Sequence, residues 1–159
     1  MQGNTYASYN KFPSSMEQLM PFGAWLVSGV EPIKDFDASG RGPDEFVQAR
    51  DKESGLPLWM VTVQSGDLEN APAWLHRLKV KVVAERQPEL PPVMPGTPFR
   101  PVYLEGLVVV PYMDDKACTP AEPGRRHRCR AKVAYSVRAS GIRAPKTNER
   151  PAPSQENAA

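Results

Sequence analysis

The sequence has few of the residues that metal sites and disulfide frameworks use. Its 159 residues include only two cysteines and two histidines. Two cysteines do not make a disulfide framework. Cys118 and Cys129 also stand too far apart for the close Cys-x2-4-Cys pair of a structural zinc site, and no fourth ligand is evident beside them and His127. We therefore expect free thiols, no bound metal and no cofactor.

Long apolar runs are missing as well. No stretch approaches the ~20 consecutive apolar residues of a membrane-spanning helix. Residues 1–18 lack the charged region followed by an apolar region that marks a secretory signal. The sequence thus predicts a cytoplasmic protein that makes no membrane contact and keeps its cysteines as thiols.

The motifs of common catalytic sites are absent too. There is no Gly-rich phosphate loop, no nucleophile elbow around a serine and no His-Glu-x-x-His pair. The acidic residues between Asp35 and Glu45 do not have the spacing of an EF-hand calcium loop, and we interpret them as a solvated loop. We expect a protein that is not an enzyme.

Proline, by contrast, is abundant, with 18 residues against 11 glycines. This composition favours short strands joined by turns over long helices. Residues 87–98 hold five prolines and are predicted to form an extended connection. Apolar or alternating segments bounded by turn residues predict six short strands, at residues 22–30, 46–49, 58–64, 76–85, 102–113 and 131–142.

These strands predict an all-β fold with a single domain at residues 17–145. Gly106 interrupts the 102–113 segment, and a sheet can bend there to close on itself. This bend favours a small β-barrel of the OB kind, with a small β-sandwich as the alternative. Residues 1–16 and 146–159 lack an apolar face and are predicted to be a flexible arm and a disordered tail.

Charge is divided unevenly between the two halves of the chain. Residues 1–75 carry five Lys and Arg against ten Asp and Glu, whereas residues 76–159 carry fifteen against eight. In the basic half, Lys79 and Lys81 alternate with apolar residues, so both lysines leave the same face of their strand. A β-domain that gathers positive charge on one face predicts a polyanionic partner, and nucleic acid is the first candidate.

Single-stranded nucleic acid binds where a basic groove lies beside rings on which bases stack. Alternation in the last predicted strand groups Tyr135 with apolar residues, which predicts a buried ring, and leaves Lys132 and Arg138 exposed. Trp59 is predicted to be buried and Tyr103 to be exposed. The residues predicted to contact nucleic acid are Lys79, Lys81, Arg100, Tyr103, Arg125, Arg126, Arg128, Lys132 and Arg138.

The basic run RRHRCR at residues 125–130 fits two interpretations. Clusters of this kind often contact phosphates, and they also serve as ordinary solubilising loop residues. The second interpretation applies to every charged face of the chain. Each face would then be exposed to solvent and would bind no partner.

Five separated segments resemble one protein family. They span residues 20–146 and read MPFGAWLVSGVEPIKDFD, FVQARDKESGLPLWMVTV, LKVKVVA, PFRPVYLEGLVVVPYM and VAYSVRASGIRAPK. In this order they look like the actinobacterial family of plasmid replication, integration and excision activators. The resemblance implies a non-enzymatic accessory protein that promotes replication and recombination of an integrative plasmid. The insertion CTPAEPGRRHRC within residues 114–130 departs from the family pattern.

The order of the predicted strands is also similar to that of small OB-fold proteins that coat single-stranded DNA, such as those of filamentous phages. This likeness agrees with the charge argument, and we expect single-stranded DNA as the partner. The alternative is a protein–protein adaptor or transcriptional activator. Its acidic segment at residues 31–53 would recruit a replication initiator or a recombinase. Self-association into a homo-oligomer also stays open.

Overall fold

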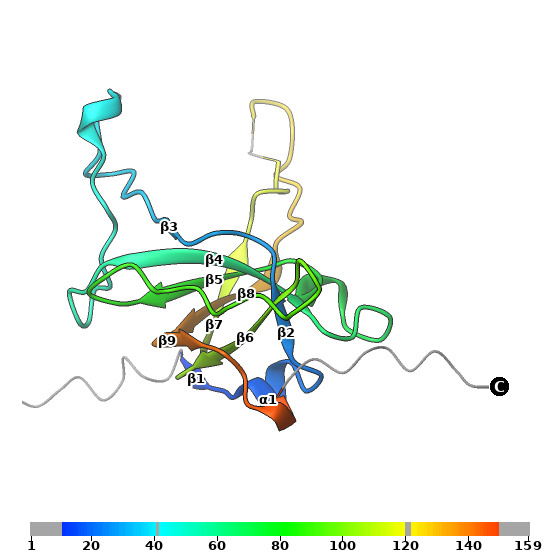
Figure 1. Cartoon of the computed structure of the whole chain (residues 1–159). Coiled ribbons are helices and arrows are strands. Elements are labelled where there is room, and N and C mark those ends of the chain that lie inside the picture. Colours follow the sequence, from blue (N-terminus) through cyan, green and yellow to red (C-terminus); the bar gives the residue numbers. More distant parts are fainter. Residues whose placement is uncertain (1–10, 41, 120–121, 150–159) are drawn as a thin grey trace, which may run out of the picture.

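The computed structural model describes residues 11–40, 42–119 and 122–149. Within them the chain forms one curled, barrel-like β-sheet with very little helix (Figure 1). The predicted all-β fold is confirmed. No helix in the described ranges is long and apolar enough to cross a membrane.

The sheet contains nine strands among the described residues. They are β1 (Phe12–Pro13), β2 (Ala24–Leu26), β3 (Glu31–Pro32), β4 (Leu58–Ser65), β5 (Leu78–Val83), β6 (Arg100–Glu105), β7 (Val108–Asp114), β8 (Lys132–Ala139) and β9 (Gly141–Arg143). The helical segments are short, namely α1 (Met16–Leu19) and the 3-10 turns η2 (Pro43–Glu45), η3 (Ala73–Leu75) and η4 (Thr147–Glu149).

The strands follow the spatial order β1-β7-β8-β5-β4-β2-β6-β9, and β3 adds to β4. Neighbouring strands are antiparallel except for β5 and β8, which run parallel. The parallel pair joins strands that are far apart in the sequence. The chain can form it only by passing through β6 and β7 first.

Apolar residues of β4 and β5 build the centre of the core. In β5, Leu78, Val80 and Val82 are buried and the residues between them are not. Val61 and Val63 of β4 pair with Val80 and Leu78 and are buried on the same side. The apolar face that alternation predicted for these two strands is therefore the inner face of the curled sheet.

Gly106 makes the corner that the sequence predicted. The predicted 102–113 strand divides there into β6 and β7, which occupy distant positions in the sheet. Gly106 has a φ of +59°, a conformation that glycine adopts without steric cost. A second corner, at Ser140, divides the predicted 131–142 strand into β8 and β9, and the Ser140 N–H donates to the Glu105 carbonyl at 2.8 Å.

Both ends of the folded domain differ from the prediction. Residues 11–16, predicted to be part of a flexible arm, include β1, which pairs with β7, and Met16, which is only 3% exposed. At the other end, residues 147–149 form η4, and Glu149 makes an ion pair with Arg143 of β9. Apolar periodicity could not reveal either end because each contributes only one or two anchoring side chains. Residues 1–10 and 150–159 lie outside the described ranges.

Two predicted strands are shorter in the structure than in the sequence analysis. The 22–30 segment contributes only β2, since Gly23 takes a positive φ and ends the extended run on one side. The 46–49 segment forms no regular strand, only an isolated bridge between Gln48 and Lys34.

The corner at Gly106 generates a stability prediction. A Cβ at this position would lie 2.2 Å from Ser140 Oγ, and the positive φ adds backbone strain. We expect Gly106→Ala to lower the free energy of unfolding in urea by roughly 1–2 kcal/mol. Gly29→Ala is the matched control, because nothing lies within 4 Å of its Cβ position and its φ is ordinary. Equal effects of the two substitutions would contradict the assigned role of Gly106.

Candidate nucleic-acid interface

The outer face of β5 carries Lys79 and Lys81, because the apolar residues of this strand face the core. The parallel register places Lys81 directly beside Arg138 of β8. On the other side, Lys81 pairs with Met60 of β4, which carries no charge. Two cationic side chains from distant parts of the sequence thus stand next to each other on one surface.

A pocket of about 600 Å³ opens on this surface between β5 and the β7–β8 hairpin. The two parallel strands pair only over Val80–Val82 and Val137–Ala139, so Tyr135 and Ser136 lie beyond the paired stretch. No acidic residue lines the pocket. Its basic residues and tyrosines are Arg77, Lys79, Lys81, Arg138, Tyr112 and Tyr135.

The environment of Lys81 disfavours its positive charge. Burial lowers the pKa of the Lys81 ammonium group, and the charge of Arg138 lowers this pKa further. An anion bound between the two side chains would offset both effects, because it would solvate the ammonium group and separate the like charges. This arrangement is typical of a surface that receives an anion.

Arg138 is held in place by Asp51. The distance between Arg138 Nη1 and Asp51 Oδ1 is 2.7 Å, and Asp51 is only 8% exposed. Burial opposes ionisation of Asp51, but hydrogen bonds from Ser54 and the charge of Arg138 outweigh it and lower the pKa of this carboxyl. Arg138 Nε is buried and has no hydrogen-bond partner among the described residues. This donor is enclosed by the protein and is not exposed to a ligand.

Two tyrosines at the pocket are more accessible than the sequence analysis indicated. Tyr135, predicted to be buried, is 50% exposed, and Tyr112 is 48% exposed. Tyr135 does share a strand face with the buried Val137, but the β7–β8 hairpin runs past the end of β5, so no strand pairs beside Tyr135 on that side. Trp74 packs against Tyr135 with ring centroids 5.9 Å apart. The signal that could have identified the exposed rings was the length of this hairpin relative to its neighbours.

Lys132 and the three predicted arginines lie along the same hairpin. Lys132 begins β8, pairs with Asp114 and shares a strand face with Arg138. Residues 115–131, which we name the basic arm, join β7 to β8 and project away from the sheet (Figure 1). Residues 120–121 of this arm lie outside the described ranges. The predicted arginines Arg125, Arg126 and Arg128 are exposed on the arm, as is Arg130.

Two residues predicted to contact nucleic acid belong to other parts of the molecule. Arg100 begins β6, and its guanidinium group donates to the Pro91 carbonyl. Tyr103 also lies in β6, separated from β5 by β4 and β2 in the sheet. Neither residue lines the basic pocket. Alternation predicts only which face of its own strand a residue occupies. It does not predict where that strand lies in the curled sheet, and β6 lies away from the basic pocket.

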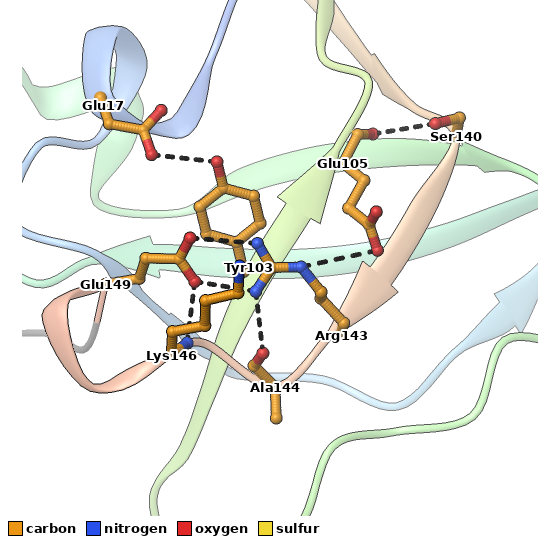
Figure 2. Close-up of polar contacts among 8 residues, drawn as sticks. All are labelled: Glu17, Tyr103, Glu105, Ser140, Arg143, Ala144, Lys146 and Glu149. Carbon is orange, nitrogen blue, oxygen red and sulfur yellow. Dashed lines mark hydrogen bonds and ion pairs between the residues drawn. The ribbon is translucent and has the colours of Figure 1, made fainter.

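Tyr103 is instead the centre of a polar cluster that joins the two ends of the domain (Figure 2). Its hydroxyl donates to Glu17 of α1 at 3.0 Å, and the Arg143 guanidinium carbon lies 3.9 Å from the ring centroid. Arg143 donates to both carboxylate oxygens of Glu149, at 2.8 and 3.1 Å. Glu105 adds an ion pair to Arg143 at 3.7 Å. With one ring face covered by Arg143, the cluster has a structural role.

The cluster predicts a dependence of stability on pH. The hydrogen bonds from Arg143 and from the Lys146 N–H lower the pKa of Glu149 from 4.5 to about 2. Because the folded-state pKa is depressed, this stabilisation is complete above pH 4.5 and is lost as the pH falls towards 2. We expect Glu149→Gln to unfold more easily than the wild type at pH 6, with the difference shrinking as the pH drops. Chemical unfolding from pH 6 to pH 2 measures this, and a difference independent of pH would contradict it.

Comparisons of the chain with protein-family models, with curated proteins and with solved structures found no match. The family resemblance of the five segments stays a prediction. Among the residues that the structure places, no three His, Cys, Asp or Glu side chains come together as a group that could hold a metal ion.

Proposed function

We propose that this protein binds single-stranded nucleic acid in the basic pocket between β5 and the β7–β8 hairpin. The observation that carries the proposal is the composition of the pocket, whose lining has four basic residues, two half-exposed tyrosines and no acidic residue. Single-strand binding surfaces combine these same two elements, a basic groove and stacking rings.

The lysines of β5 have a spacing that suits the nucleic-acid backbone. Lys79 and Lys81 are two positions apart on one strand face, which corresponds to about 7 Å of strand rise. Successive phosphates of an extended single strand are separated by a similar distance. The unfavourable proximity of the Lys81 and Arg138 charges favours a phosphate at this end of the row.

The tyrosines favour a single strand over a duplex. A ring binds a base by stacking on its flat face, and this contributes ~1–3 kcal/mol per base. In a duplex those faces are already covered by neighbouring base pairs. Tyr112 and Tyr135 flank a pocket of about 600 Å³, which is within the ordinary range for a ligand of nucleotide size.

The biological role in this proposal comes from the family resemblance. We propose a non-enzymatic accessory protein of an actinobacterial integrative plasmid that promotes its replication, integration and excision. Rolling-circle replication of such an element exposes single strands, which are the ligand that the pocket suits.

A second candidate function is an adaptor that recruits a replication initiator or a recombinase. One observation favours it, because the acidic segment between β3 and β4 presents Phe36 with 82% of its surface exposed, between Asp35 and Asp37. Binding to an oligonucleotide separates the two functions. Phosphate neutralisation weakens steeply with salt, whereas an apolar adaptor contact does not.

Charge reversal on β5 tests the phosphate contacts. We expect Lys79→Glu with Lys81→Glu to fold normally, since neither residue contributes to the core, and to lose at least tenfold in affinity, or about 1.4 kcal/mol. Fluorescence anisotropy with a labelled oligonucleotide measures the affinity. The salt dependence should also fall by roughly one to two units of slope.

The control for this variant reverses two exposed charges outside the pocket, Arg86→Glu with Lys146→Glu, and changes the net charge equally. We expect it to retain nearly all of the affinity. Equal losses in both variants would indicate a diffuse charge effect and not a site. A wild-type protein without oligonucleotide binding at low salt would leave the adaptor function as the surviving candidate.

Removal of the stacking rings tests the second element of the pocket. We expect Tyr112→Leu and Tyr135→Leu each to weaken binding by roughly fivefold or more, which corresponds to the lower limit of ~1 kcal/mol per stacked base. The slope of affinity against salt should not change, because no charge is removed. Tyr103→Phe is the control, since this ring lies outside the pocket, and its affinity should equal that of the wild type. A change in salt slope without a loss of affinity would argue against stacking.

A further inference from the structure

The two cysteines flank an isolated antiparallel bridge within the basic arm. Thr119 and Arg128 form an antiparallel bridge, in which the Thr119 N–H donates to the Arg128 carbonyl at 3.1 Å. Extended by one residue towards the base of the arm, this register would place Cys118 opposite Cys129. Both are free thiols, Cys129 exposed and Cys118 half-buried.

The type of pairing suits a covalent link. The Thr119 N–H bond to the Arg128 carbonyl is that of a hydrogen-bonded pair. Extension of this register by one residue would make Cys118 and Cys129 a non-hydrogen-bonded pair, and such pairs have Cα atoms about 4.5 Å apart. Disulfides join residues whose Cα atoms are ~4.4–6.8 Å apart. Side chains of directly opposite residues also leave the same face of the ladder.

A hydrogen bond to sulfur supports this register. The Arg130 N–H donates to Cys118 Sγ at 3.3 Å. The Cys118 sulfur therefore already lies against the backbone that follows Cys129.

We propose that Cys118 and Cys129 are a reversible redox site, in which a disulfide closes the basic arm into a ring. This inference rests on the register of the arm and not on nucleic-acid binding. Because Cys129 is exposed on an arm that projects from the sheet, the disulfide forms and breaks easily, as is typical of labile, regulatory disulfides.

The oxidant is a low-molecular-weight disulfide such as oxidised glutathione. One protein thiolate attacks a sulfur of the oxidant, which forms a mixed disulfide and releases one small thiol. The second protein thiolate then attacks the protein sulfur of that mixed disulfide and releases the second small thiol. The two protein thiols lose two electrons and two protons in total, and the oxidant takes them up as two thiols.

Charge and exposure favour this reaction at the arm. The arm carries five Lys and Arg against one Asp and one Glu, so it attracts an anionic oxidant such as oxidised glutathione. The ring closed by the disulfide contains Arg125, Arg126 and Arg128. Closure reduces the number of conformations that these three arginines can adopt relative to each other.

The experiment equilibrates the full-length chain with defined ratios of oxidised and reduced glutathione and measures intact mass. We expect the wild type to lose two hydrogen atoms as a monomer and tryptic peptides from the two sides of the arm to be linked. Cys118→Ser and Cys129→Ser should each instead accumulate a glutathione adduct, because no second thiol displaces it.

A register-shifted variant is the matched control. Cys118→Ser with Thr119→Cys keeps two thiols in the arm, but places them on opposite faces of the ladder. We expect its equilibrium constant for disulfide formation to be at least tenfold lower than that of the wild type, and this difference to disappear in urea. Circular dichroism checks that the variant folds, and Cys129→Ser with Arg130→Cys is a second shifted pair if it does not.

Three outcomes would overturn the proposal, namely equal constants for the wild-type and shifted pairs, a wild type that ends with two glutathione adducts, or oxidation only to disulfide-linked dimers. None of these measurements uses an oligonucleotide. Failure of the redox site and failure of the nucleic-acid proposal are therefore distinguishable.

Discussion

The parallel pairing of β5 with β8 is the constraint on which the rest of this structure depends. It places the buried Val80 and Val137 together on the inner face and Lys81 and Arg138 together on the outer face. A parallel pair between distant strands needs a long crossover, and here the crossover passes through β6 and β7 and turns sharply at Gly106. The same pairing therefore closes the core and assembles the basic surface.

This arrangement brings like charges together, which costs free energy, and Asp51 compensates for part of that cost. Its carboxylate neutralises Arg138 at 2.7 Å from a nearly buried position. Asp51 comes from the acidic half of the chain, just before β4, whereas Arg138 comes from the basic half. The ion pair between Asp51 and Arg138 thus joins the acidic half of the chain to the basic half. Lys81, which lies beside Arg138, has no carboxylate partner among the described residues.

Alternation and turn residues were enough to predict the parts of the fold that depend on local geometry. They predicted β4 and β5, the core face of both strands, the outward direction of Lys79 and Lys81 and the corner at Gly106. Alternation cannot say whether a face is covered, because coverage depends on how far neighbouring strands extend. For this reason Tyr135 was wrongly predicted to be buried. Tyr103, in turn, contacts Glu17 and Arg143, which come from segments that the sequence analysis did not place beside it.

The basic residues of the second half do not act as one surface, although the sequence presents them as one excess of charge. Arg143 forms ion pairs with Glu149 and Glu105, and the Arg100 guanidinium group donates a hydrogen bond to a backbone carbonyl. A cation already paired with protein groups gives little to a phosphate, since binding must first break the existing contacts. Lys79 and Lys81 have no ion pair within the described part of the chain, and they stand on a rigid central strand. The unpaired positive charge is therefore concentrated on β5. In the proposed function, β5 would determine where a nucleic-acid strand lies, and the basic arm on the adjacent hairpin would add only to the overall attraction.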